Sequence, residues 1–482
     1  SKVYDASATA ASSALTISGT VGGQTLTLSG NGTLSAGADA GTNKTINTSG
    51  LTLGNGSGGT AGVATNYSLV GGTYQMNVTQ RPVTISGSRF YDSTTTVNSS
   101  DISVFTNRVG GQTLSITGSG TVATAVAGSG KTVTLGTLTL ADGTGSASNY
   151  SLASGTFDIN SRQVNIAGSR IYDGTTTVNG SDLVITTGVG SEVLTVNGTG
   201  SIANANVASN KSVTAGTLAL SSASGNASNY SMGTITLTVT QRPINVDLEK
   251  TYDATTDASA GDLKSNGITN TVLGHSLTLN GTGTMSNTSV GIGKSVSVGT
   301  LSVSGAQSSN YTLVGGTHTI DVNPRTTNAS GTRHYDATTI AGSSAFSSFS
   351  NSVGGDTITL SGTGSIASAG VGSKGVTIGS LQSAHPNYIL GNATLTVTKR
   401  PVNLSGRRIR GGTTDILASE LSFGNLAASE TLTLTGQGTI PEMRLGSHAL
   451  NLFTLSMGNG SGSTSNYTFT GGSFIFTILD PL

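Results

Sequence analysis

The dipeptide Asn-Tyr recurs six times along the 482 residues, and this repetition limits the possible folds more than any other feature of the chain. The six copies begin at Asn66, Asn149, Asn229, Asn310, Asn387 and Asn466, at intervals of 83, 80, 81, 77 and 79 residues. A constant period of this length indicates an array of repeated structural units rather than a few unrelated domains.

Other markers keep the same period. Tyr-Asp begins at Tyr4, Tyr91, Tyr172, Tyr252 and Tyr335, and a basic residue lies two positions before each copy, at Lys2, Arg89, Arg170, Lys250 and Arg333. A strand-like hexamer such as Thr25–Gly30 or Thr113–Gly118 follows in every copy. The copies meet at short motifs such as Gln80-Arg81-Pro82. These junctions predict repeats at residues 1–81, 82–162, 163–242, 243–325, 326–400 and 401–482.

The two end repeats differ from the others. The first lacks the Arg-Pro-Val-x-Ile-Ser-Gly strand that opens the later ones, so we expect the chain to begin inside a repeat of a longer array. The sixth has Arg408-Ile-Arg-Gly411 in place of the Tyr-Asp motif. We predict that it is a divergent terminal unit whose apolar last strand, Phe474–Leu479, is buried.

Apolar residues alternate with Thr, Ser or Gly along much of the chain, as at Val83 and Ile85. This period of two predicts half-buried strands, and the Gly-rich clusters between them supply turns. We therefore predict an all-β, linear tandem array of six small Ig-like β-sandwich repeats with six or seven strands each; a β-solenoid is the alternative. The short Arg-Pro junctions predict stiff joints and a rod of roughly 200 Å.

The composition argues against several functions. The 22 basic and 22 acidic residues cancel, so there is no basic field for nucleic acid or anionic lipid, and no apolar run is long enough to insert into a membrane. The chain has no cysteine, and its five histidines are scattered over the last three repeats. Gly130-Lys131-Thr132 lacks the first glycine of a phosphate-binding loop. We therefore expect no enzyme activity, no cofactor and no metal.

One pair of charges recurs at a nearly fixed separation of 38 to 41 residues in the first five repeats. The pairs are Asp5 and Lys44, Asp92 and Lys131, Asp173 and Lys211, Asp253 and Lys294, and Asp336 and Lys374. In the sixth repeat Gly411 and His448 stand at these places. We predict structural ion pairs that tie the opening turn to a later strand; the alternative is an intramolecular isopeptide bond involving the Lys and the Asp or the Asn of Asn-Tyr.

Eleven of the twelve tyrosines fall in the Tyr-Asp and Asn-Tyr markers. Large rings that recur in register anchor small cores, so these tyrosines are predicted to be core residues. The candidates are Tyr67, Tyr91, Tyr150, Tyr172, Tyr230, Tyr252, Tyr311, Tyr335, Tyr388 and Tyr467.

The run Arg170-Ile-Tyr-Asp-Gly-Thr-Thr-Thr177, with Thr-Leu-Thr-Leu-Ser-Gly, Gly-Lys-x-Val and Asn-Tyr-x-Leu elsewhere in the repeats, resembles the YDG-type repeat. Such repeats occur in large secreted bacterial adhesins, notably filamentous-haemagglutinin-like exoproteins of two-partner secretion. The resemblance covers essentially the whole chain; it is specific in repeats two to five and weak in repeat six. It implies a β-rich stalk of a secreted protein at the bacterial cell surface, outside the outer membrane, or in the biofilm matrix.

Two functions remain open from the sequence. The first is a structural stalk that extends or links cells, with neighbouring repeats of a longer chain as its partners. The second is a multivalent module in which each repeat offers a weak site for glycans or proteins of host or bacterial surfaces. The sequence identifies no ligand.

Overall fold

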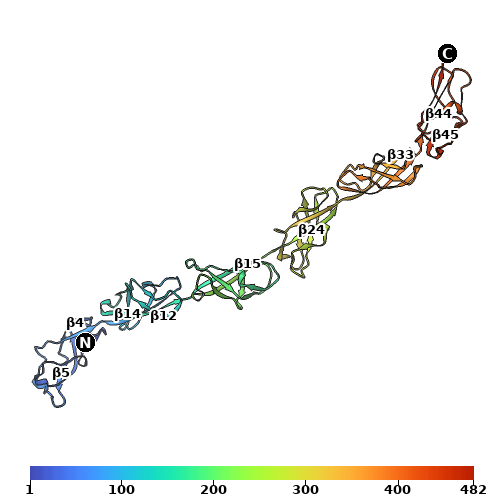
Figure 1. The fold of residues 1–482 in the computed structure, drawn as a ribbon. Helices are drawn as coiled ribbons and strands as arrows, with labels where there is room; N and C mark the ends of the chain where they lie inside the picture. The colour runs from blue at the N-terminus through green and yellow to red at the C-terminus, as the bar shows by residue number, and fades with distance from the viewer. Residues whose placement is uncertain (482) are drawn as a thin grey trace. The chain divides into compact units, whose positions relative to one another are not determined.

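The computed structural model describes residues 1–481, and its regular structure is almost entirely β-strand. Within these residues there is no α-helix, only short 3-10 turns. The predicted all-β tandem fold is confirmed, and a solenoid is not needed to describe it (Figure 1). Repeats 1 to 3 form one compact unit, Ser1–Thr240, and repeats 4 to 6 form another, Gln241–Leu482.

Repeat 2 shows the topology that the others share. Its strands are β7 (Arg81–Phe90), β8 (Thr96–Asn98), β9 (Ile102–Phe105), β10 (Leu114–Thr117), β11 (Ser119–Val122), β12 (Gly128–Thr134), β13 (Thr139–Asp142) and β14 (Tyr150–Asn160). Six of them form one sheet in the order β8-β11-β12-β14-β7-β9, while β10 and β13 form a separate two-stranded ribbon. Strands β12 and β14, both labelled in Figure 1, pair antiparallel in this sheet. A half-barrel sheet and a ribbon thus enclose one small core.

The opening strand β7 and the closing strand β14 are parallel neighbours in the middle of this sheet, joined by nine residue pairs from Tyr150–Arg81 to Asn160–Phe90. All other pairs in the sheet are antiparallel. The alternation of the sequence sets the inward face: Val83 and Ile85 of β7 and Phe157 and Ile159 of β14 are almost completely buried. The chain therefore enters and leaves each such repeat along two adjacent central strands.

Repeats 3 and 5 repeat this arrangement. In repeat 3 the strands are β15 (Arg162–Ile171), β16 (Thr177–Asn179), β17 (Leu183–Ile185), β18 (Leu194–Asn197), β19 (Thr199–Ile202), β20 (Ala208–Thr214), β21 (Ala219–Ser222) and β22 (Tyr230–Thr240). In repeat 5 they are β33 (Arg325–His334), β34 (Ile340–Gly342), β35 (Phe346–Phe349), β36 (Leu360–Ser361), β37 (Thr363–Ile366), β38 (Gly372–Thr377), β39 (Gln382–Ser383) and β40 (Tyr388–Thr398).

In repeats 4 and 6 the opening and closing strands are each divided in two. Repeat 4 contains β23 (Arg242–Pro243), β24 (Asn245–Thr251), β25 (Asp257–Ser259), β26 (Leu263–Thr269), β27 (Thr278–Asn280), β28 (Thr282–Met285), β29 (Gly291–Ser297), β30 (Ser302–Ser304), β31 (Tyr311–Thr312) and β32 (His318–Asn323). Repeat 6 contains β41 (Arg400–Pro401), β42 (Asn403–Ile409), β43 (Asp415–Leu417), β44 (Leu421–Gly424), β45 (Leu432–Thr435), β46 (Gln437–Thr439), β47 (Gly446–Ala449), β48 (Ser456–Asn459), β49 (Tyr467–Thr468) and β50 (Phe474–Leu479).

The apolar last strand β50 is central, because it pairs with β42 on one side and with β47 on the other. Phe476 and Ile478 point into the core of repeat 6 and are almost completely buried. The prediction that this strand is buried is therefore met within its own repeat.

Repeat 1 has fewer strands: β1 (Lys2–Val3), β2 (Thr9–Ala11), β3 (Leu26–Leu34), β4 (Gly41–Asn47), β5 (Leu51–Asn55) and β6 (Gln75–Thr79). Its β1 pairs with β6 in parallel, like the end of an opening strand, but over two residues only. The later opening strands begin at Arg81, Arg162, Arg242, Arg325 and Arg400, each of which is the last residue of a predicted repeat. A single residue separates β6 from β7, so one strand leads directly into the next.

Candidate functional site at the joints between repeats

The two tyrosine markers meet where one repeat adjoins the next. The Tyr of Tyr-Asp packs edge-to-face against the Tyr of Asn-Tyr from the following repeat, with ring centroids 5.4–5.6 Å apart. The pairs are Tyr4 with Tyr150, Tyr91 with Tyr230, Tyr252 with Tyr388, and Tyr335 with Tyr467. This geometry is the preferred one for aromatic pairs, and it joins the cores of adjacent repeats.

One polar side chain binds both hydroxyl groups of each pair. In the joint between repeats 2 and 3, Tyr91 donates to Oε1 of Glu192 at 2.6 Å and Tyr230 donates to Oε2 of the same carboxylate. Glu430 accepts hydrogen bonds from the hydroxyl groups of Tyr335 and Tyr467 in the same way. Both hydroxyl groups of the Tyr252–Tyr388 pair donate to Oδ2 of Asp356, each at 2.9 Å. In the joint between repeats 1 and 2, Gln112 accepts from Tyr150 and donates to Tyr4. Each of these joints thus places one polar group between two buried tyrosines.

Sequence reasoning missed these acceptors, although a signal exists. They occupy one position, immediately before the strand-like hexamer, which holds Gln24, Gln112, Glu192, His275, Asp356 and Glu430 in the six repeats. A polar side chain is present in every copy, but its type varies, so it does not form a motif. In repeat 4, His275 contacts the hydroxyl of Tyr311 through Nδ1 at 2.7 Å.

The Asn of Asn-Tyr also bridges repeats. Its Oδ1 accepts a backbone amide from the preceding repeat: Asn149 from Ala40, Asn229 from Ala127, Asn387 from Val290 and Asn466 from Val371, at 2.7–3.1 Å. These asparagines are buried, and a buried amide side chain without partners would be costly. The Asn-Tyr marker is therefore a docking element for the preceding repeat, a role that sequence reasoning did not assign.

The arginine that opens each later repeat completes the joint. Arg81 donates from Nη1 to the carbonyl of Tyr4 in the preceding repeat at 3.3 Å, and from Nε and Nη2 to Asn107 in its own repeat. Arg325 and Arg400 make the same contact with the carbonyls of Tyr252 and Tyr335. A planar guanidinium can hold two partners in fixed directions, which explains arginine at this position.

The Asp of Tyr-Asp fixes the turn that presents the tyrosine. Oδ1 of Asp253 accepts from the amide and hydroxyl of Thr255, at 3.0 and 2.9 Å, and from Nζ of Lys250 at 2.9 Å. Burial alone would raise the pKa of the Asp253 carboxyl, but these hydrogen bonds and the lysine charge outweigh it and lower the pKa. The residue after the Asp has a positive φ, for example 64° at Ser93 and 78° at Gly174. This left-handed conformation explains the Gly of the Tyr-Asp-Gly motif.

The predicted Asp–Lys pairs do not form, and the structure corrects this interpretation. The aspartates Asp5, Asp92, Asp173, Asp253 and Asp336 pair instead with the basic residue three positions earlier, Lys2, Arg89, Arg170, Lys250 and Arg333. Across residues 1–481 no ion pair or hydrogen bond joins them to Lys44, Lys131, Lys211, Lys294 or Lys374. A local i, i+3 partner on the same turn needs no long-range closure, which favours it physically. An isopeptide bond between these Asp and Lys side chains has no supporting contact.

The lysines donate hydrogen bonds to the backbone of a different loop. Lys294 donates to the carbonyl oxygens of Asn287 and Ser289, and Lys44 donates to the carbonyl oxygen of Asp39 at 2.6 Å. Burial and the charge of nearby Lys250 lower the pKa of Lys294. The loop held by Lys294 carries Val290, whose amide binds the Asn of the next repeat. Asp and Lys therefore recur together because they shape two parts of the same joint, not because they touch.

Nine of the ten predicted core tyrosines are buried, and one is not. Tyr91, Tyr150, Tyr172, Tyr230, Tyr252, Tyr311, Tyr335, Tyr388 and Tyr467 are all at most 6% exposed. Tyr67 in repeat 1 is only half-buried, although its hydroxyl makes the familiar bonds to Val21 and Gln24. In the described part of the chain no second ring packs against it.

Burial and the shared carboxylate stabilise the neutral form of the tyrosines. The pKa of Tyr335 and the pKa of Tyr467 are each raised to about 12, first by burial and then by Glu430. The pKa of Tyr91 and that of Tyr230 are raised by burial and Glu192. The hydroxyls therefore remain hydrogen-bond donors at neutral pH.

Repeat 6 departs from the pattern at its far side. Arg408 keeps the place of the basic residue but approaches Glu420, with 3.4 Å between Nη1 and Oε1. His448, at the place of the lysine, contacts the carbonyl of Arg444 through Nε2. Tyrosine, aspartate and lysine are all replaced together, as expected if they serve one joint.

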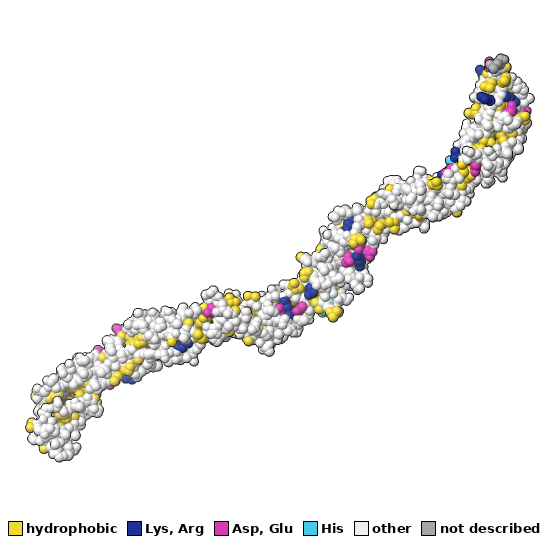
Figure 2. Space-filling view, viewed as in Figure 1, with side chains coloured by type: hydrophobic (Ala, Val, Ile, Leu, Met, Phe, Trp, Pro, Cys, Tyr) yellow, Lys and Arg dark blue, Asp and Glu magenta, His cyan; other side chains and the backbone are white. Residues whose placement is uncertain are grey.

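Charged side chains are sparse elsewhere. Figure 2 shows them as small separate groups on a mostly uncharged visible face. Within residues 1–481 no three His, Asp or Glu side chains are grouped as metal ligands, and no helix is long and apolar enough to cross a membrane.

These features define a class of tandem β-repeat protein whose units are joined by side chains as well as by the backbone. The YDG domain model matches residues 1–77, 73–157, 159–238, 235–320 and 317–397. The chain belongs to the YDG domain family, with five matched copies and a sixth that shares the fold. No curated protein matches the chain.

Proposed function

We propose that the chain is a non-catalytic structural stalk of a secreted bacterial adhesin, which holds a binding region away from the cell surface or links cells in a matrix. The observation that supports this most strongly is the use of the repeating side chains. The motif residues Tyr, Asn, Asp and Lys, and the opening arginine, all serve the joints described above. Motif residues of a binding or catalytic module would instead converge on an open pocket.

The joints favour a fixed angle between neighbouring repeats. A ring pair, two hydroxyl–carboxylate bonds, an asparagine bond and an arginine bond act around a linker of a single residue. Bending such a joint would separate several buried contacts at once. A secreted location and a role in adhesion are part of the proposal and follow from the likeness to adhesin repeats.

Small-angle scattering on the full chain tests the mechanical part of the proposal. We expect a rod of roughly 200 Å. A variant with Glu192→Ala and Glu430→Ala should bend more and give a smaller radius of gyration, whereas Glu192→Gln with Glu430→Gln should match the parent. A compact parent particle would contradict a stiff stalk, and equal scattering from all three proteins would contradict the stiffening of the joints by Glu192 and Glu430.

A glycan array tests the alternative of a multivalent binding module. Single and tandem repeats are compared on the same surface, because avidity should strengthen binding steeply with copy number if each repeat carries a site. Binding that rises with the number of repeats would replace the stalk proposal by the module.

A further inference from the structure

The closing strand of repeat 4 is interrupted by a glycine-containing turn that a histidine side chain holds in place. Residues 313–317 form this turn between β31 and β32. The carbonyl oxygen of Leu313 accepts two hydrogen bonds, from the amide of Gly316 at 3.1 Å and from Nε2 of His318 at 2.8 Å. The imidazole of His318 therefore ties the start of the turn to the first residue of β32.

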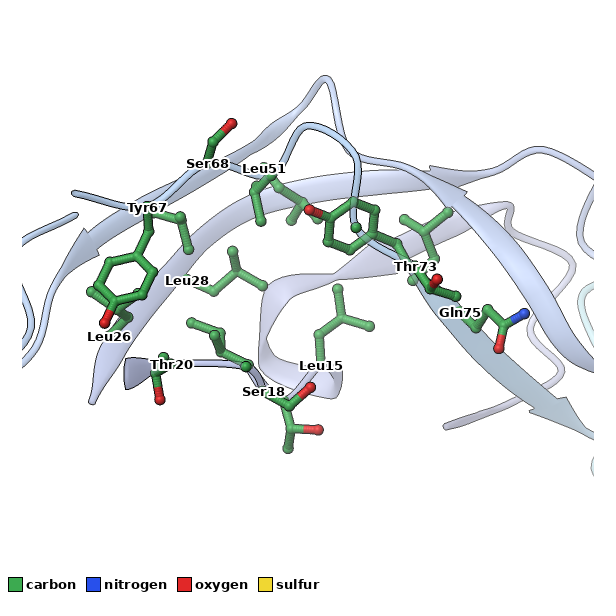
Figure 3. A pocket seen from close by; sticks show the side chains of 18 residues that line it. Leu15, Ser18, Thr20, Leu26, Leu28, Leu51, Tyr67, Ser68, Thr73 and Gln75 are labelled. Atoms are coloured by element: carbon green, nitrogen blue, oxygen red, sulfur yellow. The ribbon is translucent and has the colours of Figure 1, made fainter. Parts of the chain in front are cut away.

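The same turn occurs in repeats 1 and 6, with an aromatic ring at the position of His318. The segments are Tyr67–Tyr74, Tyr311–His318 and Tyr467–Phe474. A Cβ atom added to the second glycine would lie 3.1 Å from the ring of His318 and 3.0 Å from that of Phe474, so the ring covers the turn in both repeats. Tyr74 is only half-buried and borders a hollow of about 600 Å³ in repeat 1 (Figure 3). Repeat 6 is therefore the better comparison, and its ring carries no ionisable group.

The imidazole of His318 is buried with one nitrogen unpaired. The residue is 8% exposed, and Nδ1 has no hydrogen-bond partner within residues 1–481. A carbonyl oxygen can only accept, so Nε2 carries the proton that it donates to Leu313, and Nδ1 of the neutral ring carries a lone pair. A second proton would turn Nδ1 into a donor and give the ring a charge. An unpaired buried cation costs far more than an unpaired neutral acceptor, so protonation favours an open turn in which water reaches the ring.

No carboxylate of the described chain faces His318 from the strands around it. Side chains alternate between the two faces of β24 and β32, so Asp247, Glu249 and Asp321 lie on the outward face, opposite His318. Asp247 and Asp321 already bind Nζ of Lys264, at 3.0 and 2.7 Å, and Glu249 accepts from an asparagine amide. The other titratable or charged groups on β23, β24, β29, β31 and the loop 270–277 are Arg242, Lys250, Lys294, Tyr311 and His275. None of these groups can supply a negative charge to His318 in mild acid.

We propose that His318 is an acid-sensitive switch within repeat 4. Protonation of its imidazole releases residues 313–317 and loosens the repeat locally, and deprotonation closes the turn again. Histidine is the side chain whose charge ordinarily changes between about pH 5 and 8. The closed repeat binds one proton fewer than the open one, so its stability falls as the pH falls. This switch would regulate the stiffness of the chain and is independent of what a stalk presents.

Hydrogen exchange on the full chain at pH 7.5, 6.0 and 5.0, corrected for the intrinsic effect of pH on exchange, tests the switch. The reporter amides are those of Gly316, which donates to Leu313, and Val246, which donates to the carbonyl of Thr317. The matched amides in repeat 6 are those of Gly472 and Leu404, which make the equivalent bonds to Phe469 and Ser473. Between pH 6.0 and 5.0, opening at the reporters should increase by about three- to tenfold relative to the matched amides, because one proton is taken up on opening.

Two variants separate His318 from other effects of acid. His318→Phe gives repeat 4 the ring that repeat 6 carries, and His318→Gln keeps a donor for Leu313 without an ionisable ring. Both variants should lose the relative increase in opening between pH 6.0 and 5.0. Opening in the parent that does not change relative to repeat 6, opening that becomes slower in acid, or the same increase in either variant would overturn the proposal.

Discussion

Replacing Glu192 by alanine tests the joint between repeats 2 and 3 directly. Tyr91 and Tyr230 are 4% and 6% exposed, and both hydroxyls donate to this one carboxylate. Alanine removes both acceptors and leaves the hydroxyls in a place that water reaches poorly. The chemistry of the rings and the backbone of the joint are unchanged.

The expected loss follows from the two unsatisfied groups. A buried donor without a partner costs about 1–3 kcal/mol, and some relaxation of the half-buried site will reduce the sum for two of them. We therefore expect Glu192→Ala to destabilise the joint by about 2–4 kcal/mol, which is about 30- to 700-fold in a local opening equilibrium.

Hydrogen exchange on the full chain measures this opening. The amide of Ala127 is a suitable reporter, because it crosses the joint to Asn229 at 2.9 Å. Its exchange should accelerate by the factor given above in Glu192→Ala. The Glu430 joint in the same molecule has the same chemistry and should be unaffected, so it serves as the internal standard.

Glu192→Gln is the matched control. Gln112 already holds two tyrosine hydroxyls in the joint between repeats 1 and 2, so an amide can satisfy this geometry. We expect protection within about threefold of the parent, or under 1 kcal/mol. Unchanged protection in Glu192→Ala, or an equal loss in both variants, would refute the idea that the shared acceptor stabilises the joint.

Three further changes have defined outcomes. Asn229→Ala should destabilise the joint by about 1–3 kcal/mol, since the Ala127 amide loses its acceptor, and exchange at that amide should accelerate accordingly. Ser93→Gly should stabilise repeat 2 by about 0.5–1 kcal/mol in urea unfolding, because the residue has a φ of 64° and glycine tolerates it; lower stability would contradict this. Raising the pH should weaken the Tyr335–Tyr467 joint, because unfolding releases protons that the native hydroxyls retain to a pKa of about 12. Stability should be insensitive to these groups below about pH 9 and should fall by about 1.4 kcal/mol per pH unit per tyrosine between about pH 10 and 12. Thermal unfolding at a series of pH values measures this slope, and the variant with both Tyr335→Phe and Tyr467→Phe is the control.

The sequence predicts the strands well because their cause is local. Alternation such as that of Val83 and Ile85 assigns a buried and an exposed face to each strand without any knowledge of its neighbours. The parallel pairing of β7 with β14 is not local. It joins residues about seventy positions apart, and no turn motif encodes it.

Only part of the joint between repeats could be predicted from the sequence. The nearly constant separation of Asp and Lys is a real feature of the sequence. It shows that both residues depend on the same structure, but it does not show that they are in contact. The partner of Asp253 is Lys250. The three-residue spacing between a basic residue and the Asp also recurs in the repeats, and it suits a local turn better. The shared acceptors were invisible because Gln, Glu, His and Asp each fill the site in different repeats, so residue identity varies while hydrogen-bond capacity persists.

The placement of opening and closing strands as parallel neighbours has a mechanical consequence. A pull on the two ends of repeat 2 acts on the start of β7 at Arg81 and on the end of β14 at Asn160, which are opposite ends of the parallel pair. The load is then a shear along the strands and is shared by nine residue pairs at once, whereas a hairpin pulled from its open end separates one pair at a time. Resistance to forced unfolding depends on the unfolding rate, and so on the barrier to breaking these pairs together, rather than on equilibrium stability. Small domains with thin cores can in this way resist tension far better than their modest size would indicate.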